Sequence, residues 1–152
     1  MKNALFGAAA MAATLYAYPA TAQSWSPAQT EVWQAVSNHW ANHVEGSDWH
    51  EVMTADSYGW GGSALLPRSR DQFAASARVF GAEGKILHYE LNPLAITARD
   101  DVAVVHYMAM ITEEDHKGER EFNVERCSDV MVRESGGWKF LGWGCADMSD
   151  DD

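Results

Sequence analysis

Basic residues are scarce in this chain, which has 11 Lys and Arg against 22 Asp and Glu in 152 residues. Nucleic acids and anionic membrane surfaces both bind clustered positive charge, so we expect neither as a partner. Long apolar runs are also lacking, because no segment after residue 22 approaches the roughly 20 apolar residues of a membrane span. The stretch GWGG, 59–62, lacks the Lys-Ser/Thr ending of a phosphate-binding loop. These absences exclude nucleic-acid binding, membrane association and nucleotide binding through a phosphate-binding loop.

The N-terminus has the three parts of a secretory signal peptide. Lys2 is followed by a mostly apolar run, Leu5–Tyr18, and then by the small residues 20–22. We therefore expect residues 1–22 to be removed and the mature protein to be periplasmic or secreted. A lipid anchor has no acceptor, because no cysteine stands at the expected cleavage site.

Removal of this leader leaves 152 − 22 = 130 residues, the size of one domain that can bury its own core. We expect a single domain over residues 23–147, since no repeat, linker or low-complexity segment interrupts it. The tail 148–152 ends in three aspartates, whose like charges repel one another and stay solvated. We expect this tail to be disordered.

Three capping boxes precede helical patterns in the first half of the chain. They start at Ser26, Asp48 and Ser69, and Pro27 follows the first in a position that favours helix initiation. The second box is followed by EVMTAD as the body of a short helix. The boxes predict three helices, over about 26–46, 48–56 and 69–84.

Stretches rich in alternating β-formers, separated by turn residues, make up the rest of the chain. We expect a short strand in SYGWGGSAL, between the second and third helices. Four long strands are expected at 85–98, 102–114, 120–134 and 138–148. Helices followed by an antiparallel meander predict an α+β fold in which the helices cover one face of a curved sheet.

The stretches GSDWHEVMTAD, SYGWGG, LHYELNPLAI, DVAVVHY and RCSDVMVRESGGWKFLGWG follow one another along the chain. In this order they resemble the nuclear transport factor 2-like (NTF2-like) superfamily, which includes ketosteroid isomerase and the SnoaL-like polyketide cyclases. The resemblance covers essentially the whole mature chain. It implies a cone-shaped, curved antiparallel sheet wrapped around three N-terminal helices, with an internal apolar pocket and often a homodimer.

The resemblance also allows a test of one function. The helix Tyr, the strand carboxylate base and the acid donor of ketosteroid isomerases match the positions of His39, Gly61 and Ser128 in this sequence. None of the three family residues is kept. We therefore expect no steroid isomerisation by that mechanism.

His106 and Arg126 are the leading candidates for chemistry. Alternation places His106 and Met108 on one face of their strand, and Arg126 and Ser128 on one face of the next. By the resemblance, both faces point into the pocket. There burial would lower the pKa of His106 and favour its basic form, while Arg126 could bind a carboxylate or a developing oxyanion. The alternatives are a core histidine with one hydrogen bond, and an ion pair of Arg126 with Glu51, Glu90 or Asp129.

The first helix and the many aromatic residues supply the other site candidates. His39 and His43 stand four residues apart, but this pair lacks a zincin Glu and a third ligand, so we expect no metal. His39 is a candidate acid/base group, with a solvated histidine as the alternative, and Tyr89 is a candidate proton donor. Core packing is the alternative for each aromatic residue. The expected ligand contacts are Tyr58, Trp60, Met108, Ser128 and Trp138.

The only two cysteines flank a hairpin in RCSDVMVRESGGWKFLGWGC. With a three-residue loop over 135–137, Cys127 stands directly opposite Cys145. Because export permits oxidation, we predict a disulfide between them. Their parity is opposite to that of Arg126, which places the disulfide on the outer face of the hairpin.

These features favour an exported, cofactor-independent lyase or isomerase that uses general acid/base chemistry on a small hydrophobic substrate, aromatic compounds included. His106 with His39 or Tyr89 would be the acid and base, and Arg126 would stabilise negative charge. The alternative is a non-catalytic periplasmic ligand-binding protein or a dimeric accessory protein, in which these residues are structural.

Overall fold

The computed structural model describes residues 24–44, 49–61 and 64–148. The expected leader, the predicted cap Asp48 and the last four residues of the tail lie outside the described residues. Within them, no helix is long and apolar enough to cross a membrane.

Helix α1, Pro27–Val44, begins at the first capping box, as predicted. The amide of Ser26 donates to Oε1 of Gln29 at 2.8 Å, and the amide of Gln29 donates to Oγ of Ser26 at 3.3 Å. This reciprocal pair satisfies amides that have no partner within the helix. One face of the helix is buried, through Val32, Val36, His39 and Trp40.

The second predicted helix is only partly helical. A short 3-10 helix, η1, covers Trp49–Val52, and strand β1, Met53–Trp60, follows at once. The prediction of a helix through MTAD is therefore wrong, and the strand expected in SYGWGGSAL starts earlier. Strand β1 pairs in parallel with the last strand of the sheet, and this tertiary pairing outweighs the weak helical preference of the segment.

Helix α2, Arg70–Glu83, begins at the third capping box, as predicted. The amide of Ser69 donates to Oε1 of Gln72 at 2.9 Å, and the amide of Gln72 donates to Oγ of Ser69 at 3.4 Å. Immediately before this helix, the two-residue strand β2, Arg68–Ser69, pairs antiparallel with β1.

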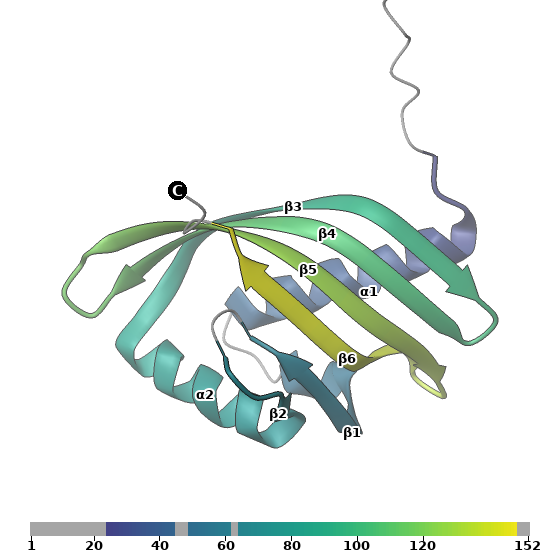
Figure 1. The fold of residues 1–152 in the computed structure, drawn as a ribbon, viewed down its shortest axis with the longest axis horizontal. Helices are drawn as coiled ribbons and strands as arrows, with labels where there is room; N and C mark the ends of the chain where they lie inside the picture. Colours follow the sequence, from purple (N-terminus) through teal and green to yellow (C-terminus); the bar gives the residue numbers. More distant parts are fainter. Residues whose placement is uncertain (1–23, 45–48, 62–63, 149–152) are drawn as a thin grey trace, which may run out of the picture.

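The four long strands form as predicted. They are β3, Gly84–Arg99; β4, Val102–Asp115; β5, Arg120–Glu134; and β6, Gly137–Asp147. The order in the sheet is β2-β1-β6-β5-β4-β3. The meander β3 to β6 is antiparallel, but the parallel β1–β6 pair makes the sheet mixed rather than purely antiparallel. The sheet is open and curves over α1 and α2, which confirms the α+β class (Figure 1).

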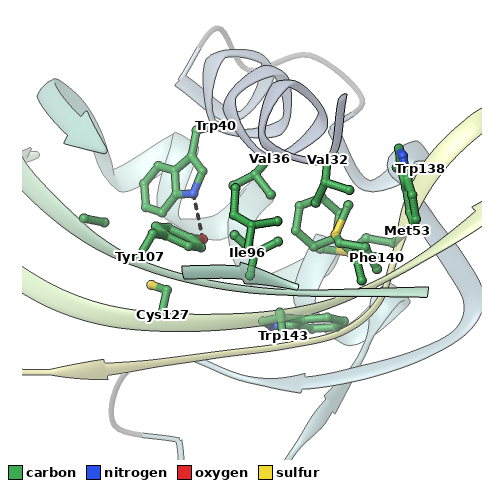
Figure 2. Close-up of a cluster of buried hydrophobic side chains, with 14 of the residues drawn as sticks. Val32, Val36, Trp40, Met53, Ile96, Tyr107, Cys127, Trp138, Phe140 and Trp143 are labelled. Atoms are coloured by element: carbon green, nitrogen blue, oxygen red, sulfur yellow. Dashed lines mark hydrogen bonds between the residues drawn. The ribbon is translucent and has the colours of Figure 1, made fainter. Parts of the chain in front are cut away.

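The helices cover the face of the sheet that carries the odd-numbered residues of β4 and β5, and we call this the inner face. Figure 2 shows α1 side chains reaching toward Tyr107 on it. The predicted inward orientation of His106, Met108 and Arg126 is wrong, because their positions lie on the opposite, outer face, where His106 and Arg126 are exposed. Strand β4 is apolar on both faces, so alternation alone does not tell which face the helices cover.

The Cys127–Cys145 disulfide is present, as predicted, with Cα atoms 4.1 Å apart. It lies on the inner face, however, and not on the outer one. The hairpin turn has two residues, 135–136, instead of three, and Leu141 bulges from β6. The shorter turn and the bulge each shift the register by one residue in opposite directions, which restores the pairing of the two cysteines.

Candidate functional site

A cavity of about 220 Å³ lies between the inner face of the sheet and helices α1 and α2. Gly59 of β1 packs directly against Trp143, which lines this cavity. A Cβ at position 59 would overlap the ring of Trp143. The aromatic part of the wall is formed by Trp40, Trp60, Phe73, Tyr107, Phe140 and Trp143.

Asp129 of β5 lines this cavity and is only 1 % exposed. Burial raises the pKa of its carboxyl group from 3.8 to about 7, and the hydrogen bond with Tyr107 opposes the rise. Its Oδ2 has no hydrogen-bond partner within the part of the chain that the structure describes. Asp129 is therefore a carboxyl group that keeps its proton up to near-neutral pH and has one oxygen available to a ligand.

Tyr107 connects Asp129 to helix α1. The indole Nε1 of Trp40 donates to the hydroxyl oxygen of Tyr107 at 3.1 Å (Figure 2). Burial and the negative charge of Asp129 raise the pKa of Tyr107 well above its ordinary value, so the hydroxyl keeps its proton. Because Trp40 supplies the hydrogen bond that Tyr107 accepts, the tyrosine proton is directed to Asp129, and this chain holds the carboxyl group in place.

Two further carboxyl groups, Glu113 of β4 and Glu125 of β5, line the same cavity. Burial raises the pKa of both side chains. Nearby negative charge adds to the effect, from Glu121 at Glu113, and from Asp147 and Glu113 at Glu125. No Lys or Arg is among the described residues that line the cavity. Its ionisable groups are thus mainly acids.

Helix α1 contributes His39 and His43 to the cavity wall. His39 is 8 % exposed, and its ring packs on Phe140 with the ring centroids 4.6 Å apart. Burial lowers the pKa of His43, which favours its neutral form. The position predicted for His39, at the pocket, agrees with the structure, and an imidazole stands across the cavity from the sheet carboxyl groups.

The two cysteines cannot act as thiolate ligands of a metal ion. Glu125, Cys127 and Cys145 form the one cluster of three potential ligands among the described residues, but both sulfur atoms belong to the disulfide. A disulfide sulfur carries neither a proton nor a thiolate charge. The 4.0 Å approach of Cys127 Sγ to Glu125 is therefore a packing contact rather than a donated hydrogen bond.

Three of the predicted site residues gather on the outer face instead. His106 Nδ1 lies 2.8 Å from Ser128 Oγ, and both residues line a groove together with Arg126. All three are exposed. The structure brings them together, as their alternation indicates, but the sheet separates their side chains from the inner cavity. The predicted ion pair of Arg126 with Asp129 does not form, because the two side chains lie on opposite faces.

Of the remaining predicted site residues, one lines the cavity and the others lie elsewhere. Trp60 lines the cavity. Tyr89 instead stacks on the α1 residue Trp40, with the ring centroids 5.9 Å apart. The other three, Tyr58, Met108 and Trp138, do not line the cavity.

Asp129 and Tyr107 are absent from the residues that the sequence predicts for the site. A usable signal exists, because Asp129 alternates with Cys127 and Met131 and thus shares their face of β5. A lone carboxylate among buried residues is a strong candidate for a functional group. The opposite face of β5 is rich in valine, so from the sequence it resembles a core-facing side more closely than the face that carries Asp129.

Residues 33–144 match the family model of the SnoaL-like domain. The chain belongs to the SnoaL-like domain family. The matched part of this SnoaL-like domain includes His39, Tyr107 and Asp129, so the candidate site lies within the family region. No curated protein matches the chain.

Solved structures share the fold of this SnoaL-like domain at low sequence identity. A ketosteroid isomerase-like protein from Erwinia carotovora atroseptica is 12% identical, with a TM-score of 0.71 over 82% of this chain and 99% of that one. An NTF2-like protein from Rhodospirillum rubrum is 17% identical, with a TM-score of 0.67 over 77% and 98%. A protein from Catenulispora acidiphila in complex with S-DNPA is 16% identical, with a TM-score of 0.65 over 78% and 91%. These matches confirm the NTF2-like fold.

Proposed function

We propose that this SnoaL-like domain binds a small hydrophobic molecule in the inner cavity and transfers protons on it as a cofactor-independent isomerase or lyase. The observation that carries the proposal is Asp129, a buried carboxyl group with one oxygen unpartnered among the described residues, in the wall of an apolar cavity. A cavity of about 220 Å³ is smaller than most ligand sites, which favours a compact substrate of one or two rings.

The chemistry follows from the protonation state of Asp129. Below a pKa of about 7 the carboxyl group is neutral and can donate its proton to a substrate oxygen that gains negative charge. Tyr107 keeps it oriented, and His39 on the opposite wall is positioned to accept or return a proton at carbon. This assignment replaces the predicted pair of His106 and Arg126, which would have acted from the outer face.

Proton exchange tests this proposal without knowledge of the product. Small cyclic ketones and 1,3-diketones, selected by thermal shift, are incubated with the protein in D₂O, and deuterium incorporation beside the carbonyl group is followed by NMR. We expect Asp129→Asn to slow the exchange at least ~100-fold, the usual contribution of a general acid or base. The matched control Asp56→Asn removes an exposed strand carboxylate and should leave the rate unchanged.

The outer-face residues provide the contrasting result. His106→Ala and Arg126→Ala should not alter exchange, because neither side chain reaches the cavity. If these two variants lose activity while Asp129→Asn keeps it, the proposed site is wrong. Binding without exchange in the wild-type protein would instead support the accessory, non-catalytic binding protein.

We also propose that the protein is exported and that its two cysteines are oxidised in the mature form. The disulfide is typical of proteins outside the reducing cytoplasm, and the leader-like sequence of residues 1–22 supports secretion or a periplasmic location. An intact mass that begins at Gln23, measured on protein expressed with its leader, supports cleavage. A mass that retains residue 1 contradicts it.

A homodimer through the outer face is also part of the proposal. Apolar side chains are exposed there, among them Val130 at 37%. Val130→Asp should raise the dimer dissociation constant at least tenfold, because it places a charge in an apolar contact. Analytical ultracentrifugation measures this change, with Leu65→Asp, in the exposed loop between β1 and β2, as the control. A wild-type monomer at all concentrations would contradict the proposal.

A further inference from the structure

We propose that the cavity ligand is an organic cation, a compact aromatic or alicyclic amine whose positive charge is bound by Glu113 and Glu125. The inference rests on the inner cavity being the ligand site of the proposed function, and it names the chemical class of that ligand. The cavity combines carboxyl groups with aromatic walls, a pairing that suits an ammonium ion better than a neutral or anionic molecule.

The charges of the lining residues point to this class. Asp129, Glu113 and Glu125 contribute three carboxyl groups, and no Lys or Arg is found among the described lining residues. Charged groups removed from water are normally paired with opposite charge or with a ligand. The only basic side chains among the described lining residues are His39 and His43, and burial lowers the pKa of His43. A bound cation would supply the opposite charge.

The second observation is the unpartnered oxygen of Asp129. This side chain is 1 % exposed, and its Oδ2 lacks a hydrogen-bond partner in the described part of the chain. Unsatisfied buried polar atoms are rare in folded proteins, and each one calls for an explanation such as a ligand. Because Asp129 lines the same cavity as Glu125 and lies on the same strand, one ligand can reach from Glu125 to this unpartnered oxygen.

The strand geometry gives the ligand an orientation. Glu125 and Asp129 lie on the same face of β5, four residues apart, which corresponds to roughly 13 Å along an extended strand. A polar group at the Asp129 end and a cationic group at the Glu125 end would thus be separated by a ring system. Burial and neighbouring acids raise the pKa of both glutamates, and a bound cation would oppose that rise.

The aromatic wall supports a cation as well. Trp143 packs against Phe73 of α2 with the ring centroids 5.1 Å apart, and Trp40 of α1 also lines the cavity. The negative faces of such rings attract ammonium groups, most strongly in desolvated sites. The same rings pack against the apolar body of the ligand, so no additional recognition group is needed.

Matched ligands test the inference with the intact mature protein. Tryptamine, tryptophol and indole-3-propionate share one ring system and carry an ammonium, a hydroxyl and a carboxylate group, and phenethylamine with 2-phenylethanol forms a smaller pair. We expect isothermal titration calorimetry to show each amine binding at least tenfold more tightly than its alcohol. Indole-3-propionate should bind most weakly.

Variants separate the charge preference from folding and from catalysis. The double variant Glu113→Gln/Glu125→Gln should bind amine and alcohol equally while keeping its affinity for the alcohol, and the exposed Glu119→Gln should behave as the wild type. Equal binding of amine and alcohol by the wild type, no binding of either amine, or a preference that survives the double substitution overturns the inference. An amine preference together with unchanged proton exchange in Asp129→Asn would leave it standing and refute only the catalytic proposal.

Discussion

Asp129→Asn is expected to raise the free energy of unfolding at pH 8 by up to roughly 4 kcal/mol and to leave it nearly unchanged at pH 4. The buried carboxyl group has a pKa of about 7, against 3.8 ordinarily. Each unit of pKa corresponds to about 1.4 kcal/mol of differential interaction. Asparagine has a similar shape and never ionises, so it avoids the cost of a buried charge.

The direction of the pH dependence follows from linkage. Between pH 4 and 7 the folded protein holds a proton on Asp129 that the unfolded chain has released, so protons stabilise the folded state in this window. The contribution of Asp129 to stability is fully present below the unfolded pKa and is lost as the pH rises through about 7. Glu113 and Glu125 shift in the same direction, so the difference between variant and wild type isolates Asp129.

Urea unfolding at pH 4, 6 and 8 measures this difference. The control Asp56→Asn, an exposed carboxylate of β1, should change the free energy of unfolding by less than ~0.5 kcal/mol at every pH. A variant that is equally stable relative to the wild type at pH 4 and pH 8 would show that Asp129 has an ordinary pKa.

Removal of the disulfide is expected to have the second largest effect. In Cys127→Ala/Cys145→Ala, a closed loop of 18 residues is opened, and the entropy gained by the unfolded chain should lower the free energy of unfolding by about 3 kcal/mol. Cys127 is 3% exposed and packs in the core, so the loss of its sulfur adds a smaller packing cost. Cys145 also lines the cavity, so ligand affinity should fall as well.

Chemical unfolding with and without a reductant tests this effect. The reduced wild-type protein should approach the stability of the double variant, because both lack the cross-link. Its intact mass should increase by two hydrogen atoms on reduction. An unchanged mass, or a double variant as stable as the oxidised wild type, would contradict the expectation.

Local signals in the sequence predict most of the elements correctly. The capping boxes at Ser26 and Ser69 identify the starts of α1 and α2, since their hydrogen bonds involve only nearby residues. The strands of the meander follow from alternation and turns. The error at Met53–Trp60 has a non-local cause, because the parallel partner of β1 is β6, which lies far away in the sequence.

The candidate site is harder to predict than the elements that carry it. Alternation and cross-strand register correctly place Tyr107, Cys127 and Asp129 on one face and His106 with Arg126 on the other. Which of these faces the helices cover depends on how α1 and α2 pack, and both faces of β4 are apolar. Reversal of that single choice exchanges the predicted His106 site for the Asp129 site.

Asp129 keeps its proton to near-neutral pH at the wall of the inner cavity. Carbon-13 NMR of the carboxyl groups measures this directly, with the Asp129 signal assigned by its absence in Asp129→Asn. We expect a titration midpoint at about pH 7, and a midpoint near the ordinary 3.8 would show that burial does not raise the pKa of Asp129.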